Sequence, residues 1–488
     1  MSALIRDRYG VEVEAADETA VMVLDEAVHT LVGLEGDPVA AISAAADSGL
    51  VLARCLLAYL HCYSGSRRGY ALARDVLDGT PAPSAARERA HLAAARSWAS
   101  GDLDAAAGHL ERALLRHPRD LLALKLAQDL YLALGDQVNL RDVAARVLPA
   151  WPEGRPGAGF VAGMYAFGLE ECGDYRAAER YGRAALAANA RDAWAAHAVL
   201  HVFEMEGRQA DGLAFVAETA RDWGPSYFAV HNWWHSGLYR LELGQLRHAL
   251  AVYDDCVAAQ GLATPLGRAD AASLLWRLWL HGVDLGERAS TLADAFEASL
   301  SDSAYCFNDW HAVMTLALAG RLGTAYGLTA ELATRASGTN KVMLERAGLD
   351  VILGVLAFAR RQYPSAVKLL GQARRHASVV GGSHAQRDAI DLTLLAAAAA
   401  CDTTAGLDQG NGTGLAADSG DLVRALVAER VARKPTAGRA ARLVIEASQA
   451  RAAWPGSVQH RAALNDSWWG GWGSNPRPAD YESAALTG

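Results

Sequence analysis

The chain of 488 residues lacks several features that mark common protein classes. Lysine is almost absent and no basic cluster stands out, which together with a net charge of −9 argues against a nucleic-acid surface. No apolar run reaches about 18 residues and the N-terminal stretch has no secretory apolar region, so neither a membrane span nor export is predicted. The six cysteines form no C-x-x-C pair, which excludes a thiolate zinc site and suits a reducing cytoplasm. We therefore expect a cytoplasmic protein with no nucleic-acid or membrane partner.

The motifs of common enzyme classes are also missing. No phosphate-binding glycine loop, nucleophile-elbow serine or dinucleotide fingerprint occurs. Proline is limited to 14 residues and no run of alternating β-branched residues persists, whereas alanine and leucine dominate. At this length a single compact core is not expected. The composition therefore predicts an all-α chain, built as an elongated repeat array.

A glycine-centred turn recurs along the chain and defines the repeat. The stretch HLAAARSWASGDLDAAAGHLERALLRHPRD contains a Gly-Asp turn at Gly101 between two predicted helices. A corresponding turn follows at Gly135 (135 − 101 = 34), and then at Gly173, Gly207, Gly244, Gly320 and Arg361, where the second residue of the pair varies. The gap between Gly244 and Gly320 spans two units, with the missing turn expected at Gly286. A period near 34 is typical of tetratricopeptide helix hairpins. The sequence predicts an α-solenoid of about eight such hairpins in a right-handed superhelix, with no sheet.

Composition divides the chain into five predicted segments. Residues 1–85 form a leading helical block of atypical repeats, 86–400 the repeat array, 402–421 a flexible Gly/Asp/Thr-rich loop, 422–455 a closing helix pair and 456–488 a disordered tail. Within the tail, WWGGWGSNPRPADYESAALTG resembles the translation of a transfer-RNA gene, which indicates read-through. A Trp-rich docking tail is the alternative.

The first histidine pair lies in a predicted helix with clear ends. Asp192 can cap this helix and Gly207 can end it. His197 and His201, four residues apart, share one face, and Glu204 continues their row.

A second pair follows in the next predicted hairpin. Its helix is expected to start at Ser226, after Gly-Pro, and to stop at Gly244. His231 and His235 share one face of it, with Trp234 beside them.

Both rows fall on the first helix of a hairpin, and in tetratricopeptide stacks the first helices line a concave groove. Asp309 and His311, which follow the expected helix cap Asn308, belong to a later first helix. In GGSHAQRD, Ser383 is expected to start a helix whose Arg387 binds an anion or pairs with a neighbouring aspartate. The candidate groove residues are His197, His201, Glu204, His231, Asn232, Trp234, His235, Asp309, His311, His384 and Arg387.

Three interpretations fit the histidine rows. The one we favour from sequence is hydrogen-bonded packing beside Trp194, Trp233 and Trp234. The second is a metal site of His197, His201, His231 and His235 with Glu204 as a further ligand, for zinc or another imidazole-preferring ion. The Glu that zincins place inside their His motif is absent. The third is ligand contact or proton transfer by imidazole.

The chain resembles the tetratricopeptide repeat protein 38 family in four motifs, with a fifth stretch that also fits. The motifs are RDAWAAHAVLHVFEMEGR, WGPSYFAVHNWWHSGLYRLELG, FNDWHAVMTLALAGR and GGSHAQRD, and the fifth stretch is GMYAFGLEECGDYRAAERYGRAAL. The resemblance spans roughly residues 85 to 450 and implies an all-helical repeat fold without a settled activity. Leu200, Phe203 and Glu206 depart from the family pattern, in which Ala, Leu and Gln are expected.

The sequence therefore leaves two predicted functions. The first is a non-catalytic scaffold whose concave groove binds a protein, peptide or small-molecule ligand, and the sequence favours it over catalysis. The second is an enzyme or metal-dependent small-molecule-binding protein that uses the histidine rows, with zinc as the candidate cofactor.

Overall fold

A computed structural model describes residues 3–405 and 415–453. The chain divides into two compact units. The first contains Met1–Tyr239 with the short segments Asp302–Tyr305 and Gly381–Ala385, and the second contains all other residues. The predicted tail, residues 456–488, and residues 406–414 of the predicted loop lie outside the described residues.

The first unit begins with a β-hairpin. Strand β1 (Ala3–Arg6) pairs antiparallel with β2 (Glu12–Ala15), and the Asp7 carboxylate accepts a hydrogen bond from the Val11 backbone N–H at 2.8 Å in the turn. The expectation of a chain with no sheet was wrong at this point. Buried Val11 and Val13 alternate with outward glutamates over too few residues to stand out against a helical chain.

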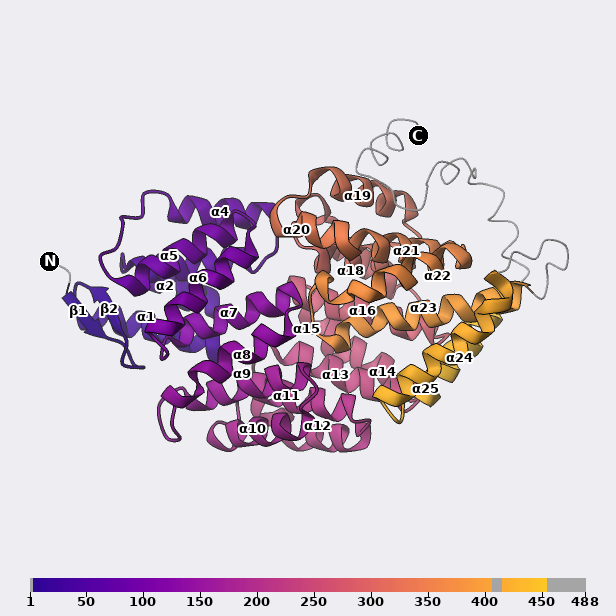
Figure 1. The fold of residues 1–488 in the computed structure, drawn as a ribbon, viewed down its shortest axis with the longest axis horizontal. Helices are drawn as coiled ribbons and strands as arrows, with labels where there is room; N and C mark the ends of the chain where they lie inside the picture. The colour runs from indigo at the N-terminus through magenta and orange to yellow at the C-terminus, as the bar shows by residue number, and fades with distance from the viewer. Residues whose placement is uncertain (1–2, 406–414, 454–488) are drawn as a thin grey trace. The chain divides into compact units, whose positions relative to one another are not determined.

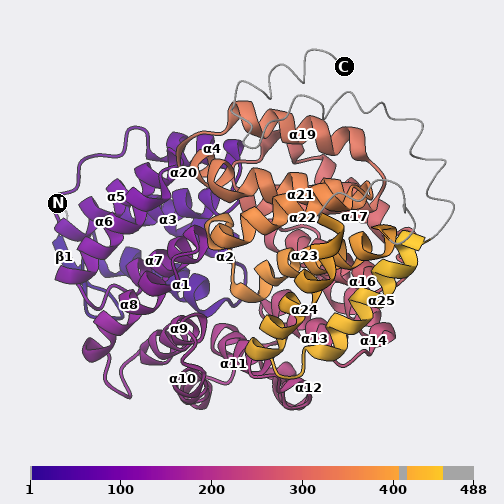
Figure 2. The same cartoon turned by 45° about the vertical axis from the view of Figure 1, so that its right-hand side comes forward.

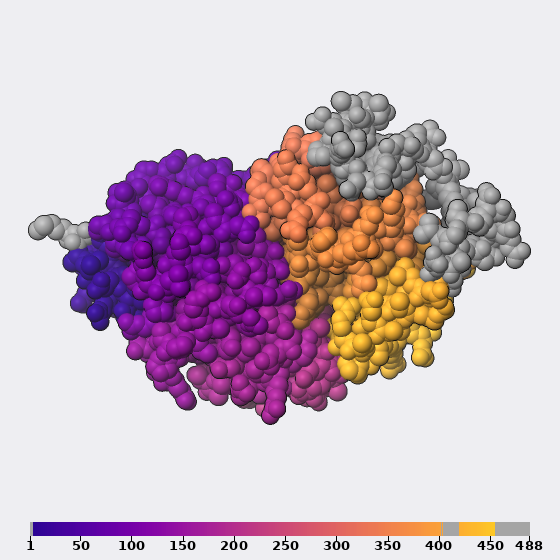
Figure 3. Space-filling model, viewed as in Figure 1, coloured from indigo at the N-terminus to yellow at the C-terminus, as the bar shows by residue number. Residues whose placement is uncertain are grey.

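The rest of the first unit consists of consecutive helices. Each packs against its neighbours in sequence, as α9 does with α10 and α11 (Figures 1 and 2). Figure 3 shows their side chains packed closely over the visible face, coloured indigo to magenta. The helices are α1 (Glu18–Gly33), α2 (Pro38–Ala46), α3 (Val51–Cys62), α4 (Arg67–Leu77), α5 (Ala86–Ala99), α6 (Leu103–Arg116), α7 (Leu121–Leu134), α8 (Gln137–Val147), η1 (Leu148–Ala150), α9 (Ala158–Glu171), α10 (Tyr175–Ala188), α11 (Ala193–Met205), α12 (Gln209–Trp223) and α13 (Ala229–Glu242), the last up to Tyr239.

The second unit continues the same pattern of paired helices. Its elements are α14 (Leu246–Val252), the π-helix η2 (Tyr253–Ala258), α15 (Ala259–Gly261), α16 (Pro265–Leu280), α17 (Arg288–Glu297), η3 (Leu300–Asp302), α18 (Cys306–Leu318), α19 (Leu322–Arg335), α20 (Gly338–Met343), the π-helix η4 (Leu344–Gly348), α21 (Leu349–Ala359), α22 (Tyr363–Ala373), η5 (Arg374–Val380), α23 (His384–Ala405), α24 (Leu415–Arg433) and α25 (Gly438–Ala453). Residue 302 and the start of α23 belong to the first unit.

One hydrogen-bonded turn joins the two helices of each repeat hairpin. Its central residue has positive φ, and the next N–H donates to the carbonyl five residues earlier, as Asp174 donates to Leu169 at 2.9 Å. Glycine adopts this left-handed conformation without steric cost, which explains why it occupies most of the turn centres. The turn occurs at Leu34, between α1 and α2, and then at Gly101, Gly135, Gly173, Gly207, Gly244, Gly282, Gly320 and Arg361. The nine turns found in the described residues are close to the predicted number of about eight hairpins.

The structure corrects two predicted details in the second unit. The turn between Gly244 and Gly320 is centred on Gly282 rather than Gly286, although both have positive φ, because Val283 N–H donates to the Leu278 carbonyl. Asn308 is not a cap, since α18 already begins at Cys306.

The predicted loop of residues 402–421 is also too long. Helix α23 continues to Ala405 and α24 begins at Leu415 rather than Leu422. The alanine-rich run before the loop favours helix and accounts for the longer α23.

Within residues 3–405 and 415–453, the helices are either too short or too polar to span a bilayer.

Candidate metal centre

Helix α11 carries the first histidine row as predicted. The Asp192 carboxylate accepts a hydrogen bond from the Ala195 N–H at 2.9 Å and so caps the helix, which ends before Gly207. The four-residue spacing places His197 and His201 on one face. Both imidazoles are buried, and His201 is fully inaccessible to solvent.

Helix α13 carries the second row. It begins at Ala229, three residues after the predicted start, because the Ser226 hydroxyl accepts a hydrogen bond from the Phe228 N–H in the preceding turn. His231 and His235 are also buried. The histidines therefore lie inside the helix packing and not on an open groove surface.

The packing of α13 against α11 brings the four imidazoles together. The ring centroid of His201 lies 4.4 Å from those of His197 and His235, and the His197 and His231 centroids are 4.8 Å apart. The two Nε2 atoms of His197 and His231 are 3.1 Å apart. One nitrogen from each of the four side chains fits into a set whose members all lie within 4.8 Å of one another.

Carboxylates lie close to two of these rings, and one of the two pairs is hydrogen-bonded. Glu204 Oε2 lies 2.9 Å from His235 Nδ1, and Glu170 Oε2 lies 3.2 Å from His201 Nδ1. A carboxylate that is hydrogen-bonded to one nitrogen of a metal-binding imidazole, as Glu204 is to His235, fixes the ring and its tautomer. Among the described residues, the Nε2 atom of His235 and both ring nitrogens of His201 have no hydrogen-bond partner.

A second group around His201 combines the predicted candidate His384 with Glu170 and Glu171, which sequence reasoning missed. Glu170 and Glu171 end α9, and His384 begins α23; Glu170 Oε1 is 2.8 Å from His384 Nε2, and the His384 backbone N–H donates to Glu171 Oε1 at 3.0 Å. One ligand atom each from these three residues and His201 again lie within 4.8 Å of one another. A signal for Glu170 existed, because it precedes Gly173 by three residues as Glu204 precedes Gly207.

Burial controls the protonation of the cluster. It lowers the pKa of His197 well below its ordinary value, with neighbouring histidines adding to the effect, and lowers the pKa of His235 to about 3 although Glu204 opposes the shift. Both imidazoles are therefore neutral at pH 7, which is the form that binds a metal. Burial opposes ionisation of Glu170, but His384 and His201 outweigh it and lower the pKa of that carboxyl.

The remaining polar and aromatic residues of the second row support the packing. The Trp234 ring stacks on His231, with centroids 5.1 Å apart and planes 14° apart. Asn232 Nδ2 donates to the Ala193 carbonyl at 3.1 Å and so ties α13 to α11. These contacts hold the imidazoles in place and leave Trp234 and Asn232 inside the protein rather than facing a groove.

Asp309, His311 and Arg387 belong to the second unit. His311 is buried, and its Nδ1 donates to the carbonyl of Phe307 one turn earlier at 2.7 Å. Asp309 and Arg387 are buried as well.

The aspartates expected to pair with Arg387 have other arginine partners. Asp388 pairs with Arg430, and Asp391 pairs with Arg374 and Arg433.

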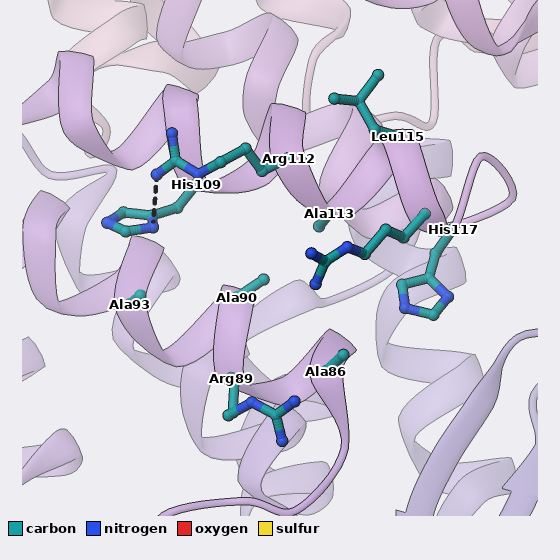
Figure 4. A pocket seen from close by; sticks show the side chains of 10 residues that line it. Ala86, Arg89, Ala90, Ala93, His109, Arg112, Ala113, Leu115 and His117 are labelled. Carbon is teal, nitrogen blue, oxygen red and sulfur yellow. Dashed lines mark hydrogen bonds between the residues drawn. The ribbon is translucent and has the colours of Figure 1, made fainter.

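A hollow of about 420 Å³ opens on the surface between α5 and α6 (Figure 4). Arginine and histidine side chains surround an alanine floor in which Ala90 and Ala93 lie. Arg112 Nη2 lies 2.9 Å from His109 Nδ1 across one side. The ten lining residues are Ala86, Arg89, Ala90, Ala93, His109, Arg112, Ala113, Leu115, Arg116 and His117, and none of them is acidic.

The recurring turn, its spacing of 34 to 41 residues from Gly101 to Arg361 and the paired helices define an α-solenoid of tetratricopeptide-type hairpins. No protein-family model matches the chain. The chain is similar to a solved structure of a monomeric IFIT1 mutant with Gppp-AAAA, at 12% identity and a TM-score of 0.41, over 90% of this chain and 96% of that one. It is also similar to a crystal structure of the APC/C hetero-tetramer Cut9-Hcn1, at 14% identity and a TM-score of 0.34, over 87% and 89%.

Proposed function

We propose that this protein is a helical-repeat scaffold that holds a divalent transition-metal ion among His197, His201, His231 and His235. The observation that carries the proposal is the convergence of four buried imidazoles from α11 and α13, with one nitrogen of each inside a 4.8 Å set. Imidazole nitrogens are ligands for zinc, copper, nickel and iron. Zinc is the candidate we favour, because a closed set of four protein ligands suits its tetrahedral structural sites.

The distances within the cluster support this class of ion. Two nitrogens bound to one tetrahedral zinc at about 2.0–2.1 Å lie about 3.3 Å apart. The His197 and His231 Nε2 atoms are separated by 3.1 Å. The competing interpretation, in which the histidines only pack, leaves the Nε2 atoms of His201 and His235 buried without a hydrogen bond among the described residues. Each such atom costs about 1–3 kcal/mol, which a bound cation would offset.

A closed, buried site favours a structural role over catalysis. A catalytic zinc site keeps one position open for water or substrate, whereas four histidines complete the tetrahedron. The ion would then fasten α11 to α13 within the repeat stack. Binding of a protein or peptide partner on the concave surface stays a prediction, as does membership of the tetratricopeptide repeat protein 38 family, which the four sequence motifs support.

Metal analysis of the purified full chain tests the proposal. The protein is stripped with a chelator, reconstituted with zinc and dialysed; we expect bound zinc and a higher melting temperature than in the stripped protein. The variant His197→Ala with His235→Ala should lose both effects. His311→Ala is the matched control, because His311 is equally buried but lies outside the cluster.

Circular dichroism checks that each variant stays helical. Wild-type protein that takes up no zinc would overturn the proposal, as would a helical double variant that binds zinc as tightly as the wild type.

A second candidate ligand site is the hollow between α5 and α6. Three arginines and two histidines line it and no carboxylate does, although the whole chain has a net charge of −9. Such a lining favours an anionic group, which arginine binds through paired N–H donors. Titration with inorganic phosphate and pyrophosphate, compared between wild type and Arg116→Ala, tests this site. Equal affinity in the two proteins would contradict it.

A further inference from the structure

The second group of candidate ligands differs in chemistry from the first. It combines two adjacent carboxylates, Glu170 and Glu171, with His201 and His384, and one atom from each lies within 4.8 Å of the others. Glu170 is fully buried and Glu171 nearly so. Mixed carboxylate and imidazole ligands suit zinc, manganese and iron.

His201 lies between the two groups. Its Nδ1 atom is 3.2 Å from Glu170 Oε2, while its ring centroid is 4.4 Å from those of both His197 and His235. The two nitrogens of an imidazole point in different directions. With Nδ1 facing the carboxylates, Nε2 remains for the other three histidines.

The loop before α23 fixes the position of His384. Gly381 and Gly382 both have positive φ, and a Cβ at Gly381 would lie 2.6 Å from the carbonyl oxygen of Ala133. Only glycine fits this close approach. The first residue of α23 therefore lies beside the end of α9, where the backbone N–H of His384 donates to Glu171.

Charge favours a cation in this second group. Two carboxylates at neighbouring positions end α9, where the helix dipole also places partial negative charge. Burying like charges together is unfavourable unless positive charge compensates them. The start of α23 contributes a partial positive charge beside the two carboxylates, and a divalent ion bound there would add to it.

We infer that the first unit holds a second divalent ion, bound by Glu170, Glu171 and His384, with His201 between the two ions. This inference rests on the proposed function, because the first ion is the one held by the four histidines. The site is then a two-metal centre with one imidazole-rich half and one carboxylate-rich half.

Metal stoichiometry of the full chain tests the second ion. Stripped protein is reconstituted separately with zinc and with manganese and analysed by native mass spectrometry. We expect two zinc ions per wild-type chain and one in Glu170→Gln with His384→Ala. Manganese should bind in a single equivalent, and the same variant should lose it, because carboxylate ligands suit manganese better than imidazoles do. Glu88→Gln is the matched control, since Glu88 is a buried glutamate of the first unit outside both groups and should leave two zinc ions bound.

The outcomes separate this inference from the proposed function. One zinc ion in the wild type that disappears in His197→Ala with His235→Ala but stays in the Glu170 variant overturns the second ion and leaves the proposed function intact; Glu170 then only orients His201. One zinc ion that disappears in both variants means a single ion shared by the two groups, which also overturns the second ion. No zinc in the wild type overturns both.

Discussion

Substitution of Gly212 by alanine should destabilise the first unit beside the histidine cluster. Gly212 lies within α12, and a Cβ there would sit 2.5 Å from Cε2 and 2.7 Å from Cζ of Tyr239. Tyr239 is fully buried, and its hydroxyl donates to the Leu200 carbonyl at 2.5 Å, which links α13 to α11. The aromatic ring has to move to admit the methyl group, and the hydrogen bond is lost.

The magnitude follows from three contributions. Overpacking of a close-packed core costs about 1–3 kcal/mol, and loss of the buried hydrogen bond costs about 0.5–1.5 kcal/mol. Replacement of glycine by alanine inside a helix stabilises the folded state by about 1 kcal/mol, because alanine has the higher helix propensity. We therefore expect Gly212→Ala to lower the free energy of unfolding by about 0.5–3.5 kcal/mol.

Urea denaturation followed by circular dichroism measures the effect. Gly108→Ala in α6 is the matched control, because the nearest atom to its added Cβ is the end of the Arg112 side chain at 3.3 Å, which can move. The control should be neutral or more stable than the wild type, since alanine favours helix. A Gly212→Ala protein as stable as Gly108→Ala would refute the close packing of α12 against Tyr239.

Three further predictions concern other parts of the molecule. Burial lowers the pKa of His311 to about 3, although the hydrogen bond to the Phe307 carbonyl opposes the shift, so the unfolded chain takes up a proton at a higher pH than the folded chain does. The free energy of unfolding should therefore fall by up to about 1.4 kcal/mol per pH unit as the pH drops from 6.5 towards 3. The melting temperature of His311→Leu should fall less over that range. Arg430→Met leaves the carboxylates of buried Glu242 and half-buried Asp388 without their shared partner and should cost about 3–5 kcal/mol in urea unfolding; a loss below 1 kcal/mol would show that the pairs contribute little. Arg116→Ala should weaken pyrophosphate binding at the hollow by at least several-fold in calorimetry, without a change in melting temperature, because that side chain is exposed.

Local sequence determines the helices and their ends. The positive φ at Gly173 and Gly207 and the cap at Asp192 follow from residue types at fixed offsets, so they can be read without knowledge of the packing. The four-residue spacing likewise places His197 and His201 on one face. The short strands and the start of α18 were missed because brief alternation and a single asparagine are weak signals beside long helical patterns.

Tertiary structure alone decides what surrounds those faces. Whether the two histidine rows meet depends on the packing of α11 against α13. That packing buries the histidines instead of leaving them on the surface of a groove. His384 and Glu171 are 213 residues apart in the chain, so no spacing rule could pair them. Their contact exists because the turn at Gly381 returns the chain to the end of α9. A sequence pattern reports which residues share a helix face, whereas a binding centre needs several faces to meet, and only the packing of distant segments brings them together.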